Sequence, residues 1–177
     1  MKRIIFLKPL GTLCIALFLI SCQKDLKDIN PQITANSTAV VAQSKMRVPF
    51  KGDFVTSREY LSAPPLLRLR ITATGTASHL GQTTAISYPT IDFRTPPPFH
   101  VSGTQVMTAA NGDQVFVSFT GYSFPPDANG VIVITASNTI TGGTGRFADA
   151  TGSFHATSLA HTHSPVGSFS FEGTISY

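Results

Sequence analysis

From residue 45 to its end, the chain alternates short strand-like runs with turn residues, and no run has a convincing helical period. In the clearest run, Leu67, Leu69 and Ile71 alternate with Arg68 and Arg70, the pattern of a half-buried strand. This spacing excludes a helical protein and predicts an all-β domain. The eight predicted strands span residues 45–57, 67–73, 81–92, 99–109, 113–124, 130–141, 152–160 and 166–177.

The composition supports an all-β domain. The chain has 177 residues, of which 42% are hydrophobic and only 12% are charged, and it contains 22 Thr and 17 Ser. Thr, Val, Ile and Phe favour strands, while the 14 Gly and 12 Pro mark frequent turns. This length gives room for one domain with its own core, preceded by a tail.

Neighbouring strands are predicted to pair in sequence order. Asn111-Gly112 lies between two predicted strands and is a strong hairpin signal. Eight antiparallel strands can close into a barrel, which removes the exposed strand edges that promote aggregation. A two-sheet β-sandwich is the alternative, and the pattern favours the barrel only slightly. An integral outer-membrane barrel is disfavoured, because the chain has no Trp for aromatic girdles.

Residues 1–21 have the form of a lipoprotein signal peptide. Lys2, Arg3 and Lys8 precede a largely apolar run from Leu10 to Ile20, which is short for a membrane span. The run ends in Leu-Ile-Ser followed by Cys22, which resembles the bacterial lipobox. The resemblance implies cleavage before Cys22 and lipidation of its thiol. The lipid at Cys22 would then anchor the chain in a membrane. An ordinary cleaved signal or an uncleaved anchor are the alternatives.

Residues 22–44 are predicted to be an acylated Cys followed by a flexible linker, with the barrel domain at residues 45–177. Gln23-Lys24-Asp25 resembles the export signal of surface lipoproteins in some Gram-negative bacteria. This resemblance implies lipid anchoring on the outer face of the bacterial outer membrane. The alternatives are a plain charged tether and a position facing the periplasm.

Charge and cysteine content exclude several classes of function. The formal net charge of +4 falls to +1 from Cys22 onward, with 10 basic and 9 acidic residues, so we expect no nucleic-acid binding. Cys14 and Cys22 both lie at the N-terminus, so the barrel domain has neither a disulfide nor a thiolate metal site. No motif indicates a cofactor.

The glycine-rich stretch GGTGR, residues 142–146, resembles a phosphate loop only superficially. No Lys followed by Ser or Thr comes after its last Gly, and no helix opens there. We therefore predict a wide corner between two strands, with glycines at positive φ, Phe147 closing the barrel end, and a single helical turn pairing Arg146 with Asp149. The predicted corner motif consists of Gly142, Gly143, Gly145, Arg146, Phe147, Asp149 and Gly152.

Four segments resemble the bacterial secreted and lipid-anchored proteins related to allene oxide cyclase and dirigent barrels. They are PFKGDF (49–54), GTASHLGQTTA (75–85), TAANGDQVF (108–116) and GGTGRFADATGSF (142–154). The resemblance covers most of the domain and implies an eight-stranded antiparallel barrel. The plant cyclases bind a fatty-acid epoxide in the barrel, and dirigent proteins steer phenoxy radical coupling. None of their pocket residues can be matched to positions here, and fold alone does not give function.

The histidines are the only obvious reactive groups. His161 and His163 are two residues apart and could hold a metal ion, with His155 at the same parity. No acid lies nearby in sequence, so solvated loop histidines are the favoured interpretation and a metal pair is the weaker one. His79 is expected to be a turn residue hydrogen-bonded to the backbone, and His100 to have a structural role.

The acidic residues offer no pair for general acid–base chemistry. Glu172 lies on the polar face of the last predicted strand, which we expect to meet water; if that face pointed inward, Glu172 would form a charged lumen with Arg68 or Arg70. Four other acids lie in or beside turns, where Asp commonly bonds backbone N–H groups: Asp92, Asp113, Asp127 and Asp149.

Two functions of different class follow. The favoured one is a lipid-anchored envelope protein with a non-catalytic barrel that binds a small apolar ligand or a partner. The alternative is a cofactor-independent cyclase or isomerase acting on a lipid-like substrate in the barrel. An open lumen lined by a few polar groups would favour ligand binding or catalysis, whereas a filled lumen would favour a structural or protein-binding role. The oligomeric state is left open, and an oligomer is compatible with the resemblance.

Overall fold

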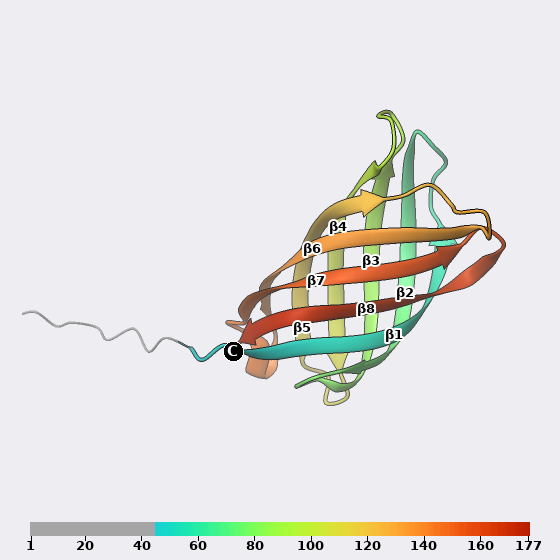
Figure 1. Ribbon diagram of the computed structural model, residues 1–177. Helices are drawn as coiled ribbons and strands as arrows, with labels where there is room; N and C mark the ends of the chain where they lie inside the picture. The colour runs from blue at the N-terminus through green and yellow to red at the C-terminus, as the bar shows by residue number, and fades with distance from the viewer. Residues whose placement is uncertain (1–44) are drawn as a thin grey trace, which may run out of the picture. The chain divides into compact units, whose positions relative to one another are not determined.

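The computed structural model describes residues 45–177, which form a closed eight-stranded antiparallel barrel (Figure 1). Each strand pairs with its neighbours in sequence, and β1 also pairs with β8 to close the barrel. The strands are β1 (Val48–Tyr60), β2 (Leu66–Ala77), β3 (Gly81–Asp92), β4 (Phe99–Ala109), β5 (Gln114–Ser123), β6 (Val131–Gly143), β7 (Thr151–His161) and β8 (Ser164–Ser176).

The barrel prediction is confirmed, and the sandwich alternative is wrong, because one continuous ladder joins all eight strands. The predicted bounds of β3 and β4 agree with the structure, but β1 begins and ends three residues later than predicted. The bounds of β1 are set by its partners: it begins at Val48, which opposes Ile175 of β8, and it ends at Tyr60, which opposes Leu69 of β2. Alternation within β1 cannot show where its partners begin and end.

The β4–β5 connection is a hairpin, as Asn111-Gly112 predicts. The backbone N–H of Ala109 bonds the carbonyl of Asp113 (2.8 Å), and the N–H of Gly112 bonds the carbonyl of Ala109 (2.9 Å). Gly112 has a φ of 90°, while Asn111 keeps a negative φ. The connection is therefore a tight turn followed by a left-handed glycine, rather than the two-residue type I′ turn usually associated with Asn-Gly.

The two ends of the barrel differ. Because the strands alternate in direction, four connections lie at one end, at residues 61–65, 93–98, 124–130 and 162–163; we call this the open end. The other end carries the connections at residues 78–80, 110–113 and 144–150 together with Lys45 and the C-terminal Tyr177; we call it the plugged end. Figure 1 shows the short helical turn of the 144–150 connection close to the C-terminus.

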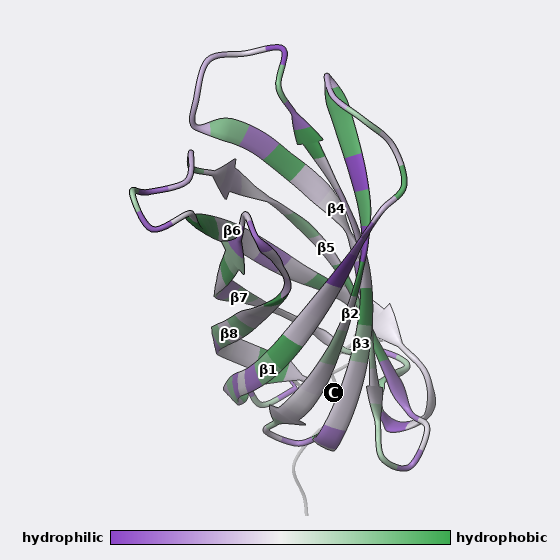
Figure 2. Cartoon of the chain, turned by 90° about the vertical axis from the view of Figure 1, so that its right-hand side faces the viewer, coloured by the Kyte–Doolittle hydropathy of each residue, from purple (hydrophilic) through white to green (hydrophobic). Residues whose placement is uncertain are grey.

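Side chains alternate between the lumen and the solvent along the strands, as the burial patterns of β1, β4 and β7 show. Figure 2 shows hydrophobic and hydrophilic residues on the same strands of the barrel. At the plugged end the lumen is filled by aromatic rings. Phe50 of β1, Phe154 of β7 and Phe171 of β8 form a triangle, with ring centroids 5.6, 4.8 and 4.6 Å apart. Met107, Val115, Ile140 and Ile175 complete this cluster, so this half of the barrel has a packed core.

The glycine-rich corner turns the chain and closes the plugged end. Gly142, Gly145 and Gly152 have positive φ, and a 3₁₀ turn spans Gly145–Phe147. Phe147 is fully buried in the core cluster, and Gly143 packs so closely on the carbonyl of Gln114 that a Cβ would not fit.

The predicted pairing of Arg146 with Asp149 is wrong. Arg146 instead approaches Asp113 of the β4–β5 connection (Nε–Oδ2 3.8 Å), and Asp149 pairs with Lys45 (3.6 Å). The turn is 3₁₀ and only three residues long, so it leaves Asp149 outside the turn and free to reach the start of the chain segment that leads into β1.

The outer face meets water, as expected for Glu172. Glu172 is exposed and pairs with Lys51 of the adjacent β1 (2.9 Å), and Arg70 pairs with Glu59 (3.6 Å). The charged-lumen alternative built from these residues is therefore wrong. Across residues 45–177, no helix is long and apolar enough to span a membrane. The signal peptide (1–21), Cys22 and the linker (22–44) lie outside the described residues.

Candidate functional site

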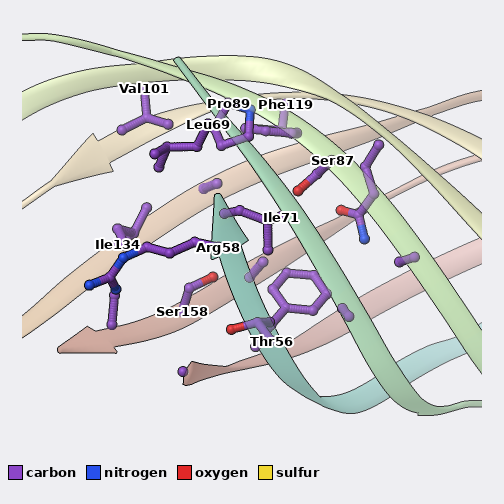
Figure 3. Close-up of a pocket in the computed structure, with 18 of the residues that line it drawn as sticks. Thr56, Arg58, Leu69, Ile71, Ser87, Pro89, Val101, Phe119, Ile134 and Ser158 are labelled. Atoms are coloured by element: carbon purple, nitrogen blue, oxygen red, sulfur yellow. The ribbon is translucent and has the colours of Figure 1, made fainter. Parts of the chain in front are cut away.

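The open half of the lumen contains a cavity of about 100 Å³. On the same scale a single buried water needs about 10–15 Å³, so the cavity holds several waters or part of a small ligand. Toward the open end its lining includes Arg58, Leu69, Val101 and Ile134, which Figure 3 labels, together with Ile91, Ala160 and Pro165.

The cavity exists because the inward positions of its middle layer are small. Ala73 and Ala85 face the lumen from β2 and β3, and Ala136 and Ala156 face it from β6 and β7. Gly167 of β8 also lines it. In the plugged half, larger Phe, Met and Ile side chains from β1, β4, β6, β7 and β8 fill the lumen, while β2 keeps the small Ala77 at its inward position. Small side chains in a barrel of this diameter leave space that the opposite wall cannot fill.

The walls of the cavity are largely apolar. Leu69, Ile91 and Val101 form a second buried cluster at the open end, separate from the plugged core. Half-buried Ile71, Phe119 and Ile134 pack against it, as do Leu67, Phe93 and Phe99 nearer the rim. The cavity thus has the lining expected of a site for an apolar ligand body.

Five uncharged polar side chains also line the cavity: Thr56, Ser87, Gln105, Asn138 and Ser158. Two of them carry amides and are almost completely buried, Gln105 with 6% and Asn138 with 3% of its surface exposed. Asn138 donates one bond to the carbonyl of Ala136 (3.1 Å). Ser87 opposes Gln105 across the β3–β4 pair, so these two polar groups lie on the same wall.

Arg58 spans the mouth of the cavity. It lies in the inward phase of β1, two residues beyond Thr56, and Figure 3 shows both side chains at the hollow. Its Nε donates to the hydroxyl of Tyr60 (3.0 Å), and its Nη2 donates to the backbone carbonyl of His161 at the end of β7. Because β8 lies between β1 and β7, the side chain bridges over one strand at the open end.

The charge of Arg58 is uncompensated. Within residues 45–177 it forms no ion pair, and it is the one ionisable side chain among the residues that line the cavity. The mouth therefore carries a positive charge with no carboxylate partner, while the floor of the cavity is neutral.

The histidines lie away from the cavity. His161 and His163 are exposed at the β7–β8 connection, and His155 faces outward from β7. Among residues 45–177, no group of three or more His, Cys, Asp or Glu is arranged to hold a metal ion. His79 has the expected turn position, since its Nε2 lies 2.9 Å from the carbonyl oxygen of Pro49.

A second hollow lies on the outer wall of the barrel, across β4 to β7. Its lining residues include the outward-facing His100, Tyr122 and His155. His100 and Tyr122 pack edge to face with ring centroids 6.2 Å apart. This hollow is a surface groove between exposed side chains, and it shares only Ala136 and Ala156 with the lining of the lumen cavity.

Two acids at the open end stabilise connections, as expected of turn acids. Asp127 accepts bonds from the backbone N–H groups of Asn129 (2.9 Å) and Val131 (2.8 Å). Asp92 accepts two side-chain bonds from Arg94, 2.9 and 2.7 Å long. These bonds, with further support from a backbone bond from Arg94, lower the pKa of Asp92 to about 2.

Sequence reasoning missed Arg58, Gln105 and Asn138, although a signal was present. Each is a polar residue in the apolar phase of its strand: Arg58 follows Phe50 and Phe54, and Gln105 lies between Val101 and Met107. Asn138 lies between Ile134 and Ile140 in the same way. A polar side chain in an inward phase indicates either a buried hydrogen-bond network or a ligand site.

Comparison with protein-family models, curated proteins and solved structures finds no match to this chain. The function must therefore be argued from the chemistry of the cavity itself, because a barrel architecture is shared by many unrelated functions.

Proposed function

We propose that this chain is a lipid-anchored cell-envelope protein whose barrel holds a small, largely apolar ligand without converting it. The observation that supports the proposal is the contrast within the lumen: one half is packed solid, and the other contains an apolar cavity beneath an open rim. A barrel that served only as a rigid scaffold would gain stability by filling both halves, because an unfilled cavity weakens a core.

The lining of the cavity favours binding over catalysis. Its polar groups are hydroxyls, amides and the guanidinium of Arg58, with no carboxylate or imidazole among them. General acid–base catalysis requires a group that exchanges a proton near the working pH, and Arg stays protonated throughout that range. A cofactor-independent cyclase or isomerase, which is the alternative, would have to act through orientation and electrostatic stabilisation by Arg58 and the amides.

The envelope location rests on the N-terminal sequence. The lipobox-like residues before Cys22 and the signal-peptide pattern of residues 1–21 support a lipid anchor, and Gln23-Lys24-Asp25 supports display on the outer face of the outer membrane. Lys45 lies at the plugged end, so the linker joins the barrel at the end opposite the mouth.

Metabolic labelling with a palmitate analogue tests the anchor. We expect the full chain to incorporate the label and to partition with membranes, and Cys22→Ser to lose the label. Protease treatment of intact cells separates surface display, in which the barrel is accessible, from a position facing the periplasm. An unlabelled full chain released into the medium would contradict the anchor.

Native mass spectrometry tests the ligand. We would purify a fragment spanning Ala42–Tyr177, which forms one compact unit and contains all eight strands. We expect a reproducible additional mass under native conditions that disappears on denaturation, and its loss in Ala136→Leu, which fills the cavity. A bare mass that stays bare after incubation with cell lipid extract would rule against the proposed function.

A further inference from the structure

Gln105 has a hydrogen-bonding capacity that the folded chain leaves unused. Its side chain faces the lumen from the middle of β4 and is 94% buried. No group among residues 45–177 forms a hydrogen bond with its side-chain amide. In this part of the chain, however, every side-chain nitrogen or oxygen that is completely enclosed has a hydrogen-bond partner. The amide atoms of Gln105 are therefore open to the cavity that the residue lines.

An unpaired buried amide is costly. Leaving such a group without a hydrogen-bond partner is destabilising, whereas an apolar side chain of similar shape would be neutral or stabilising. The surrounding inward positions show that this barrel accommodates apolar residues, since Met107 is the next inward residue on β4 and Val117 opposes Gln105 on β5. The side-chain amide of Gln105 therefore depends for its hydrogen bonds on what occupies the cavity, either water or the polar group of a ligand.

Asn138 provides a second open acceptor in the lining of the same cavity. Its Nδ2 bonds the carbonyl of Ala136, and its Oδ1, which bonds no group among residues 45–177, also belongs to the cavity lining. Gln105 on β4 opposes Val117 of β5, and Asn138 on β6 opposes Phe119 of the same strand. The two residues are therefore two strand spacings apart across the sheet and offset by two residues along it, and both line the same cavity.

We propose that Gln105 and Asn138 form a recognition site for the uncharged polar head of an amphiphilic ligand, one that both donates and accepts hydrogen bonds, bound head-first with its apolar body toward the mouth. This inference rests on the proposed function and adds the polarity and the orientation of the ligand. An alcohol or a primary amide on a short apolar chain fits the site, because Gln105 can donate and accept while Asn138 Oδ1 accepts.

The floor selects a neutral head over an anionic one. Apart from Arg58, every side chain that lines the cavity is uncharged. The single cation, Arg58, lies at the mouth and already donates to Tyr60 and His161. A carboxylate carried to the floor would lose its hydration without gaining a counter-ion, which is far costlier than burying a hydroxyl that finds hydrogen-bond partners.

Two-dimensional ¹H–¹⁵N NMR of the Ala42–Tyr177 unit tests the inference with 1-hexanol and hexanoate as probes. Gln105→Met keeps the approximate shape and removes every hydrogen-bonding atom, and it also assigns the Gln105 side-chain amide signal by its disappearance. Gln82→Met is the matched control, because it makes the same substitution at an exposed position on β3. Titrations of the wild type and both variants give dissociation constants.

We expect 1-hexanol to shift the Gln105 side-chain signal of the wild type, and hexanoate at neutral pH to leave it in place. Loss of the site's hydrogen bonds should weaken 1-hexanol binding about tenfold in Gln105→Met and leave Gln82→Met within twofold of the wild type. Because the unpaired amide is removed, Gln105→Met should be at least as stable as the wild type. The signal shift in the wild type stands as evidence even if that variant folds poorly.

Three results would overturn the inference. The first is an equal affinity of the wild type and Gln105→Met for 1-hexanol, together with an unmoved amide signal. It would mean that 1-hexanol binds through its apolar chain and that water provides the hydrogen bonds of Gln105. An equal shift with hexanoate would rule against selection of a neutral head. If neither probe binds and native mass spectrometry shows a bare protein, the proposed function fails as well, so the two failures are distinguishable.

Discussion

The two halves of this barrel are built from the same eight strands, and yet one half is a solid core and the other a cavity. The change can be followed along a single strand. From the plugged end to the open end, the inward residues of β7 are Phe154, Ala156, Ser158 and Ala160. The ladder between β7 and β6 stays in register along these positions, although the β7–β8 ladder has an irregularity between Leu159 and His161. The lumen of the open half therefore coincides with a change from a large side chain to small ones along β7.

The comparison shows how stability and binding are separated in one small barrel. Phe50, Phe147 and Phe154 are essentially inaccessible to solvent and belong to one core cluster that fills the plugged half. The open half has only Leu69, Ile91 and Val101 as its buried cluster, surrounded by half-buried residues. We infer that the plugged half supplies most of the folding energy, which lets the open half keep unfilled space and unpaired amides.

The largest effect should come from removing an aromatic ring from the plugged half. We expect Phe50→Ala to cost about 3–5 kcal/mol, because it leaves a cavity between Phe154 and Phe171, and this approaches the whole stability of a small domain. Phe119→Ala, in the open half, should cost about half as much or less, since Phe119 is already half-buried beside free space. Urea denaturation monitored by circular dichroism measures both, and equal losses would contradict the division of labour.

A second comparison adds volume to each half. We expect Ala109→Leu in the plugged half to cost about 1–3 kcal/mol through overpacking of the core cluster. Ala136→Leu in the open half should leave the free energy of unfolding within about 1 kcal/mol of the wild type, because the cavity accepts the added methyl groups. Thermal unfolding of the two variants side by side is the measurement. A strong destabilisation by Ala136→Leu would show that the open half is as tightly packed as the plugged half.

The third comparison uses glycines with positive φ at the two ends. At the plugged end, Gly145 has a φ of 56° and a Cβ there would overlap the Asp113 carboxylate, which Asn111 holds at 2.8 Å. We expect Gly145→Ala to cost about 2–3 kcal/mol from backbone strain and displacement of that carboxylate. At the open end, Gly130→Ala should cost about 1 kcal/mol, because its φ of 75° carries similar backbone strain. The new Cβ would meet only the side chain of Thr162, which can move because it lies in an exposed connection. Chemical denaturation of both variants measures the two losses of stability. A larger loss for Gly130→Ala than for Gly145→Ala would contradict the expectation.

The smallest effect concerns acid stability at the open rim. The bonds from Arg94 hold the pKa of Asp92 at about 2, below its ordinary value of 3.8, so ionised Asp92 favours the folded state. This contribution is complete above about pH 4 and is lost as the pH falls through about 2. Asp92→Asn should therefore lower the unfolding temperature slightly at pH 6, with the difference from the wild type vanishing near pH 2. A difference that persists at pH 2 would assign the effect to something other than ionisation.

Much of the fold follows from local sequence. Alternation of apolar and polar residues, with turn residues between the runs, predicts all eight strands, two of them with their observed bounds. The turn roles of His79 and Asp127 also follow, because each acts on backbone groups close to its own connection or on the adjoining strand. The wrong side-chain pairing at the corner involves contacts between segments that are distant in sequence. Arg146 pairs with Asp113 rather than Asp149, because the corner folds back on the β4–β5 connection.

The sequence by itself determined the strands and their pairing with neighbours in the chain, and it separated the apolar from the polar face in the clearest of them, because period-2 alternation is a local property of a half-buried strand. Only the tertiary structure decided that the ladder closes and that the small inward residues of several strands meet at one depth. The open cavity, the unpaired Gln105 amide and the span of Arg58 across β8 all depend on that closure. They are set by the stagger between strands, and no single strand contains that information.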